Sequence, residues 1–205
     1  MEPVSGSTEP RWLELLRSPT LIISVILVVV YVTVGIAAGS LLDPIQPVPL
    51  VYLLMQCDNP TPIFPWTIIT AIFLHANILH IASNLVFLLF FGFVLEEQVS
   101  KSQWIMTFLV TGLVGSISFV GYDSAAFVLT GSPNPSPLDC AVGASGAVYG
   151  IMGTAVGLKI VILLIFLLGL NIFAGGGTPA HLGGLVAGLV LRNYWSLGDR
   201  PFRGI

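Results

Sequence analysis

Charged residues are scarce in this chain. Lys, Arg, Asp and Glu together make up 8% of its 205 residues, whereas 55% are hydrophobic. A water-soluble domain carries about 25% charged residues, because its surface must be hydrated. The mean hydropathy is +0.96. These values exclude a soluble globular domain and indicate a multi-pass integral membrane protein that contacts the lipid bilayer.

The sequence also lacks the signals of metal and nucleic-acid binding. It has two cysteines, Cys57 and Cys140, far apart and without CxxC spacing, so it contains no zinc-like cluster. The net charge of −3 provides no basic surface for nucleic acid. We therefore expect no metal site and no nucleic-acid partner. Whether the cysteines form a disulfide or are free thiols stays open, because the sequence does not give their separation.

Charge-free runs predict six transmembrane crossings. A helix needs about 20 apolar residues to cross the hydrocarbon core, and fewer if it does not traverse the full thickness. A long run from Cys140 to Leu191 is divided by Lys159 and by the helix-breaking segment Gly175–Pro179. We expect an all-α membrane protein, a six-transmembrane-helix bundle. Its spans are about Thr20–Leu42, within Thr67–Leu95, Trp104–Tyr122, Ala144–Leu158, Ile160–Ala174 and Ala180–Leu191.

Basic residues predict the orientation. With six crossings, all seven Lys and Arg residues fall on one side of the membrane, which the positive-inside rule makes cytoplasmic. We therefore expect a cytoplasmic N-terminal segment (1–19), a membrane domain (20–195) and a cytoplasmic C-terminal tail (196–205). Both termini are then cytoplasmic, and the expected location is a prokaryotic cell membrane.

A serine and a histidine are predicted to meet near the outer face. Ser145 begins the fourth span and His181 begins the sixth, so two crossings return them to the same side. A serine hydroxyl becomes a good nucleophile when a histidine takes its proton. Small residues spaced four apart on both spans let the two helices pack closely. We expect Ser145 as nucleophile and His181 as general base and acid, in a dyad, because these spans hold no Asp or Glu.

Three further groups are predicted to complete this site. His80 and Asn84 are four residues apart and share one helix face. Together with the Ser145 backbone N–H, they would donate hydrogen bonds to the oxyanion of a tetrahedral intermediate. Tyr149 is four residues after Ser145 and is placed to support the His181 ring.

Each of these residues also has a purely structural interpretation. His80 with Asn84 would serve as a polar contact between helices, and Tyr149 as an aromatic anchor at the membrane interface. For His75, the structural interpretation is preferred: a histidine that holds the outer loop in place. A GxSG tetrapeptide alone is weak evidence, since small residues are common in membrane helices. The coincidence of the polar residues at one depth favours catalysis.

These motifs resemble those of the rhomboid family of intramembrane serine proteases. The stretch Phe73–Asn84 is similar to that family's second-span signature, with His80 and Asn84 in the oxyanion positions. Gly143-Ala144-Ser145-Gly146 with Tyr149 resembles its nucleophile motif, and Ala180–Gly184 resembles its general-base motif. The resemblance runs from about Trp66 to Leu191.

The resemblance implies a rhomboid-like six-helix core that needs no cofactor. It implies an endopeptidase that cleaves single-span membrane proteins near the outer end of the substrate's helix. Water would reach the serine from the outer face. Gly143, Gly146 and His75 would support the site.

Two other functions are weighed against this one. Only 35 residues lie between Ser145 and His181, so the fifth span covers roughly 21 Å of a hydrocarbon core of about 30 Å. This short region is the cue for a catalytically silent rhomboid-like protein that binds client transmembrane helices. A small transporter with a histidine path ranks last, because the sequence shows no inverted repeats.

Overall fold

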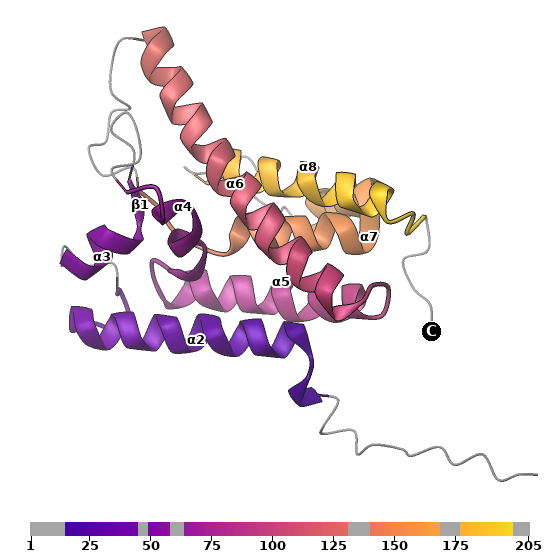
Figure 1. Cartoon of the computed structure of the whole chain (residues 1–205), viewed down its shortest axis with the longest axis horizontal. Helices are drawn as coiled ribbons and strands as arrows, with labels where there is room; N and C mark the ends of the chain where they lie inside the picture. The colour runs from indigo at the N-terminus through magenta and orange to yellow at the C-terminus, as the bar shows by residue number, and fades with distance from the viewer. Residues whose placement is uncertain (1–14, 45–48, 58–63, 131–139, 169–176, 199–205) are drawn as a thin grey trace, which may run out of the picture.

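The protein is described by a computed structural model that covers residues 15–44, 49–57, 64–130, 140–168 and 177–198. It is mostly helical, as predicted, and its long helices run side by side (Figure 1). The elements are α2 (Pro19–Ala38), α3 (Pro49–Leu54), β1 (Gln56–Cys57), α4 (Thr67–Thr70), η1 (Ala71–Phe73), α5 (Ile78–Glu96), α6 (Lys101–Thr130), β2 (Cys140–Ala141), α7 (Ser145–Leu168) and α8 (Thr178–Tyr194).

Four helices in the described ranges are long and apolar enough to cross a membrane. They comprise α2, α5, residues Lys101–Ala126 of α6 and residues Ser145–Ile162 of α7. They correspond to the first four predicted crossings. The shorter α8 has 17 residues and covers the predicted sixth. Part of the predicted fifth crossing, 169–174, lies outside the described residues.

Several predicted boundaries were wrong for local reasons. The first span ends at Ala38 rather than Leu42, because Gly39 adopts the left-handed conformation that ends many helices. The second lies within the predicted range apart from its last residue, Glu96, and it begins at Ile78, where Asn77 caps the helix by accepting from the His80 N–H. The third continues past Tyr122 to Thr130, since no glycine or proline interrupts residues 122–130.

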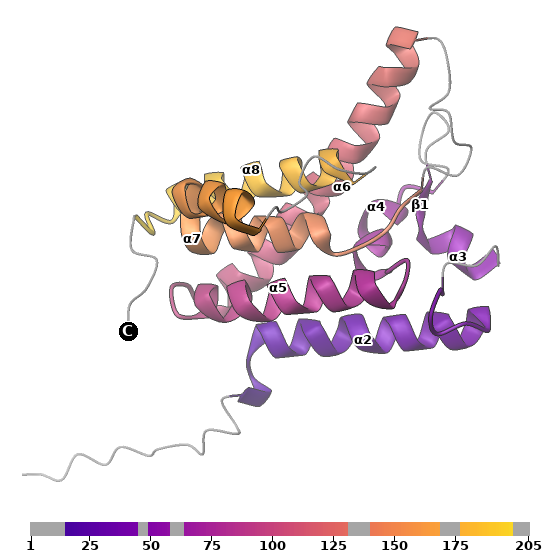
Figure 2. The same ribbon diagram turned by 180° about the vertical axis from the view of Figure 1, so that it is seen from behind.

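The division between the fourth and fifth spans was predicted at Lys159, but the backbone breaks at Gly157. Gly157 has a φ of 74°, a conformation that glycine adopts without strain. Gly157 also continues the row of glycines spaced four apart along α7, but it does not contact the α8 backbone in the way that Gly146 and Gly150 do. Instead it lies against the Arg192 side chain. In Figure 2, the later part of α7 leaves the line of its first part.

Arg192, which directly follows the predicted sixth span, is buried. It is 8% exposed and donates to the carbonyl oxygens of Thr154 and Ala155, at 2.8 and 3.0 Å. The turn at Gly157 removes the helical partners of these carbonyls, so Arg192 caps the first part of α7. At the same end of the bundle, the Glu96 carboxylate accepts from the Ser18 hydroxyl and the Thr20 N–H and caps α2.

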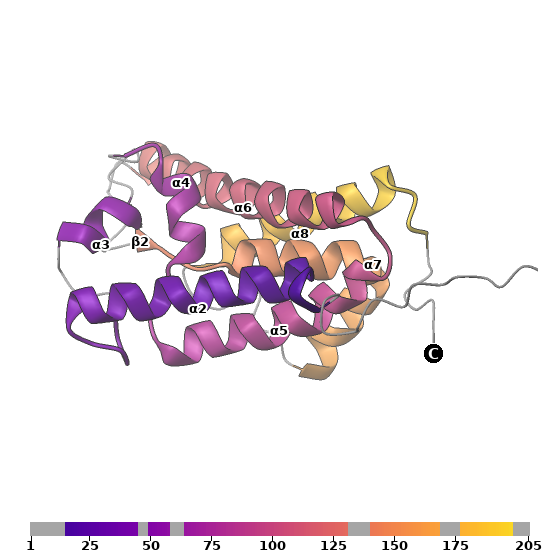
Figure 3. The ribbon, with the colours of Figure 1, turned by 60° about the horizontal axis from the view of Figure 1, so that its bottom comes forward.

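The α7 helix lies at the centre of the bundle. It packs against α5, α6 and α8, and α2 packs against the outside of α5 (Figure 3). Glycines bring α7 and α8 together, as predicted. A Cβ atom on Gly188 would lie 2.8 Å from the Gly150 carbonyl carbon, and one on Gly184 would lie 2.7 Å from that of Gly146. At such distances, even a methyl group at either position would force the two helices apart.

The two ends of the bundle differ. The N-terminal end of α2, the connection between α5 and α6 and the C-terminal end of α8 lie together at one end (Figure 1). Toward the opposite end, α3, α4 and β1 lie beside the end of α2, and β1 pairs antiparallel with β2. This two-stranded pair was not predicted. A second apolar cluster covers it, formed by buried Val34, Val51, Met55 and Leu74, with Cys140 and Val142 partly buried beside them.

Candidate active site

Ser145 is held at the first position of α7 by the segment that follows β2. Gly143 has a φ of 125°, and its N–H donates to the Ala71 carbonyl oxygen at 2.9 Å. The chain then turns into the helix, and the Ala144 carbonyl accepts from the Val148 N–H. Because Ser145 opens the helix, its own N–H has no acceptor within the helix. This N–H therefore points out of the helix end as a donor.

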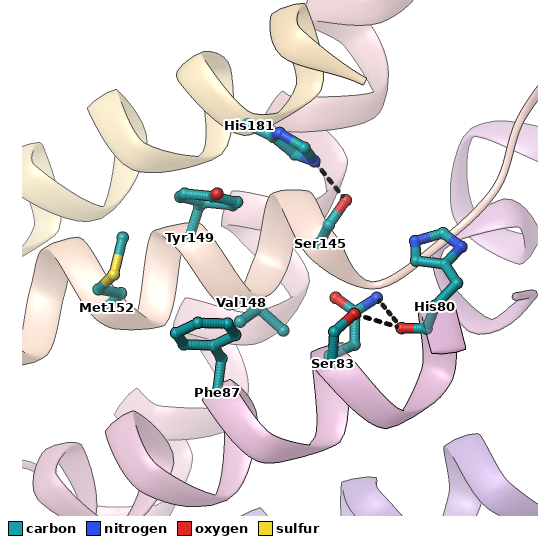
Figure 4. Close-up of a pocket in the computed structure, with 9 residues that line it drawn as sticks. His80, Ser83, Phe87, Ser145, Val148, Tyr149, Met152 and His181 are labelled. Carbon is teal, nitrogen blue, oxygen red and sulfur yellow. Dashed lines mark hydrogen bonds between the residues drawn. The ribbon is translucent and has the colours of Figure 1, made fainter. Parts of the chain in front are cut away.

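His181 lies in the first turn of α8 and faces Ser145. Its Nε2 atom lies 2.9 Å from the Ser145 Oγ, within hydrogen-bonding distance (Figure 4). Its Nδ1 atom is buried and has no hydrogen-bond partner among the described residues. With Nδ1 protonated, Nε2 is free to accept the serine proton. The geometry is that of a nucleophile and its base.

The packing of three helices brings this pair together. Gly146 follows Ser145, and a Cβ on it would lie 3.2 Å from the Ala180 carbonyl oxygen. A Cβ on Gly115 of α6 would lie 2.9 Å from the same oxygen. The carbonyl that precedes His181 is thus surrounded by glycine backbone from α6 and α7. These glycines fix the position of α8 relative to Ser145.

Tyr149 stacks on the His181 ring. The ring centroids are 4.6 Å apart and the planes are inclined by 26°. Tyr149 projects from α7 one turn after Ser145, so one helix face contacts the imidazole at both its edge and its plane (Figure 4). This contact limits rotation of the ring away from Ser145.

His80 and Asn84 face Ser145 from α5. The Ala76 N–H donates to His80 Nδ1 at 3.4 Å, so the neutral ring carries its proton on Nε2. That ring lies against Gly143, where a Cβ would be 2.6 Å from the His80 Cε1. Asn84 donates one amide hydrogen to the His80 carbonyl oxygen at 2.9 Å. A primary amide has two such hydrogens, so one remains for another acceptor.

His75 contacts the site through His80. It is 1% exposed, and the two rings meet edge to face with centroids 5.2 Å apart. Neither ring nitrogen makes a hydrogen bond of normal geometry. Burial, followed by the charge of His80, lowers the pKa of His75 to about 3, and a weaker contact with the Phe73 backbone only partly opposes this shift. His75 is therefore a neutral side chain that packs against His80 just after η1.

Two cavities flank the hydroxyl of Ser145. One, of about 160 Å³, lies between α5 and α7, and Asn84 is among its lining residues. Ser145, His80 and His181 lie at its polar end, and Phe87, Val148 and Met152 lie at its apolar end (Figure 4). The other, of about 410 Å³, opens toward β1 and β2 and is lined by Gln56, Ser116, Gly143 and Gly177 among others. Ser145, His80 and His181 line both. Groups at the serine are therefore reachable from two directions.

Several residues of the site were missed by sequence reasoning. Phe87 and Met152 continue the helix faces of Asn84 and Tyr149, so helical spacing alone could have identified them. Gln56 comes from β1 and the Ala71 carbonyl from η1, and no periodicity of the sequence reveals the positions of these two short elements. Within the described ranges, no three His, Cys, Asp or Glu side chains lie close enough to bind a metal ion.

Comparison with known proteins identifies the family. The family profile described as "Rhomboid domain" matches residues 64–196, well over half of the chain. The chain is 29% identical to Rhomboid-like protease 3 of Toxoplasma gondii over 149 residues. The matched segment covers 64% of this chain and 52% of that protein. It is 30% identical to Rhomboid protease GluP of Bacillus subtilis (strain 168) over 138 residues, and this match covers 60% of this chain and 24% of that protein.

A plant protein shows a similar match. The chain is 34% identical over 143 residues to RHOMBOID-like protein 6, mitochondrial, of Arabidopsis thaliana, which covers 62% of this chain and 42% of that protein. The chain thus spans about half the length of these relatives or less. Because they come from both a bacterium and eukaryotes, the prokaryotic origin stays a prediction. The matched profile, the apolar helices and the three motifs agree, and the chain belongs to the rhomboid family of integral membrane proteins.

Proposed function

We propose that this protein is an intramembrane serine endopeptidase that hydrolyses single-span membrane proteins near the outer membrane face. The observation that carries the proposal is the 2.9 Å contact between His181 Nε2 and Ser145 Oγ, at the adjoining ends of two apolar helices. Relatives named as rhomboid proteases support the same activity. The bilayer and transmembrane protein substrates are the proposed partners.

The first half of the reaction forms an acyl-enzyme. Ser145 Oγ attacks the scissile carbonyl carbon while His181 Nε2 accepts the hydroxyl proton. The carbonyl oxygen becomes an oxyanion, which accepts hydrogen bonds from the Ser145 N–H, the His80 Nε2–H and the free Asn84 amide hydrogen. The intermediate collapses as His181 donates its proton to the leaving amine, and the C-terminal fragment of the substrate departs with a new amino terminus.

The second half consumes water. His181 removes a proton from a water molecule that attacks the ester carbon, and the same oxyanion donors stabilise the second intermediate. Collapse returns the proton to Ser145 and releases the new carboxyl end. The larger cavity, beside β1 and β2, is the proposed route for this water, because its lining carries more polar groups than that of the cavity between α5 and α7.

A dyad is sufficient for this chemistry. No described carboxylate reaches His181 Nδ1. A third residue normally orients the imidazole. Here the Tyr149 ring and the α8 backbone take over that orienting role, and the stacking distance of 4.6 Å supports this assignment.

The membrane arrangement belongs to the same proposal. We propose six crossings, with a cytoplasmic segment 1–19, a membrane domain 20–195 and a cytoplasmic tail 196–205, in a prokaryotic cell membrane. Among the described residues, Arg17 lies just before α2, Lys101 begins α6 and Arg192 lies in the last turn of α8, all at one end of the bundle. The positive-inside rule then assigns this end to the cytoplasm and Ser145 to the outer half.

Proteoliposomes containing a single-span reporter protein test the function. Wild-type protein is expected to cleave the reporter and to react with a fluorophosphonate probe, whereas Ser145→Ala should do neither. The matched control is Ser102→Ala, which changes an exposed serine in the first turn of α6 and should keep both activities. Probe labelling that persists in Ser145→Ala would refute Ser145 as the nucleophile. Reporter binding without cleavage by wild type would instead favour the catalytically silent, client-binding function.

A further inference from the structure

The outer strand pair links three parts of the chain that surround Ser145. Cys57 in β1 lies opposite Cys140 in β2, and Gln56 lies opposite Ala141. Cys140 is disulfide-bonded, and Cys57 is the only other cysteine in the sequence. The bond therefore joins β1, which lies between α3 and α4, to the segment immediately before Ser145. The sequence had left this bond open.

One side of this link is anchored to α6. Gln56 is fully buried, and its Nε2 donates to the Ser116 carbonyl oxygen at 3.2 Å. Val51 and Met55, which precede β1, are also buried, in the apolar cluster at the outer end of the bundle. The position of β1 is thus fixed by a helix that also packs against α7 and α8.

The other side leads directly to the reacting groups. Three residues after Cys140, Gly143 holds the His80 ring, since a Cβ there would lie 2.6 Å from its Cε1 atom. Two residues later, Ser145 begins α7. Gly143 is tied to η1 by one hydrogen bond, to the Ala71 carbonyl. Without the disulfide, only the short β1–β2 pairing, this hydrogen bond and partly buried side chains among the described residues would position the segment.

From this continuous series of contacts, we propose that the Cys57–Cys140 disulfide positions Ser145 and His80 for catalysis and makes the protease sensitive to reduction. This inference rests on the proposed peptidase function. An outer location for the cysteines is consistent with it, because disulfides persist in oxidising compartments. Cys140 is partly exposed, so a small reductant reaches the bond.

The switching step is thiol–disulfide exchange with a dithiol. One thiolate of the dithiol attacks a sulfur of the protein bond, forms a mixed disulfide and releases one protein thiolate. The second thiol of the reagent then closes a ring and releases the other cysteine. Two electrons and two protons pass to Cys57 and Cys140, and the dithiol becomes a cyclic disulfide.

The test compares oxidised and reduced wild-type protein in proteoliposomes. Free thiols are counted by maleimide mass tagging, and cleavage is followed well below the thermal unfolding midpoint. Because a misplacement of about 1 Å costs up to a hundredfold in rate, we expect reduction to lower kcat and the rate of fluorophosphonate labelling by about tenfold or more. Re-oxidation should restore both rates, and KM should change by less than about threefold.

The matched variant is the double substitution Cys57→Ser with Cys140→Ser. It should show the low rate of the reduced protein and no further response to dithiol, which rules out an effect of the reagent on the substrate. If the disulfide only stabilised the fold, its reduction would lower the unfolding midpoint and leave kcat unchanged, and that result would overturn the inference. Equal kcat in the oxidised protein and the double variant would also overturn it. If oxidised wild type neither cleaves nor labels, the proposed function itself fails, and this inference fails with it.

Discussion

A methyl group added at Gly184 is expected to separate the nucleophile from its base. Gly184 lies one turn after His181 on α8, and its Cα faces the Gly146 backbone of α7. The Cβ of an alanine there would lie 2.7 Å from the Gly146 carbonyl carbon, whereas ordinary contact begins near 3.4 Å. The helices must therefore move apart by at least about 0.7 Å. Backbone atoms cannot rotate aside, so no small local adjustment relieves the clash.

This separation of the helices would also lengthen the contact between Ser145 and His181. Its 2.9 Å would lengthen to about 3.6 Å, beyond hydrogen-bonding range. Misplacement of this size costs up to about a hundredfold in rate, and overpacking costs about 1–3 kcal/mol of stability. We expect Gly184→Ala to lower kcat by about a hundredfold in the proteoliposome assay, with slower fluorophosphonate labelling and a lower unfolding midpoint.

Gly121→Ala is the matched control. Gly121 lies within α6, and a Cβ there would meet nothing within 4 Å. Alanine is the better helix former by about 1 kcal/mol, so this variant should keep its activity and unfold at the same or a higher temperature. If Gly184→Ala keeps kcat within about twofold of wild type, close contact between α7 and α8 does not set the catalytic geometry.

Three further predictions follow from the site. Asn84→Ala should lower kcat by about 10²–10³, the usual effect of losing one oxyanion donor; a change in KM alone would contradict that role. Tyr149→Phe keeps the stacked ring and should stay within about threefold of wild-type kcat, whereas Tyr149→Ala should fall by about tenfold; equal rates for both would exclude ring support. The pKa of His75 is lowered to about 3 by burial, so the unfolded chain binds more protons than the folded one between about pH 6.5 and 3. Stability is therefore lost as the pH falls through this window, and the unfolding midpoint of wild type should drop more between pH 7 and 4 than that of His75→Gln, as measured by differential scanning fluorimetry.

The meeting of Ser145 and His181 could be predicted because it depends on counting crossings. Long apolar runs are strong signals, and two crossings return the chain to the same side regardless of their exact ends. The close approach of α7 and α8 could also be predicted from the small residues spaced four apart, such as Gly146 with Gly150 and Gly184 with Gly188, because such residues let two helix backbones touch. Helical spacing likewise placed His80 with Asn84 on one face.

Other features depend on contacts between distant segments, which no local pattern encodes. Lys159 marked the predicted division between spans, but the turn depends on the left-handed conformation of Gly157 and on the buried Arg192 that caps α7. The count of basic residues predicts the side of the membrane on which Arg192 lies, but it does not predict that this side chain is buried. The β1–β2 pair has two residues in each strand, too few for any alternation of polar and apolar residues. Its disulfide could not be inferred, since the separation of two cysteines is a property of the fold.

The central claim is that Ser145 and His181 act as one unit, and a double-mutant cycle on the cleavage rate tests it most directly. Ser145→Ala, His181→Ala and the double variant are compared with wild type in proteoliposomes, with intact folding verified by their unfolding midpoints. Residues that act as a unit lose the same activity singly and together, so the three variants should show the same residual kcat. A double variant whose loss equals the product of the two single losses would contradict the account.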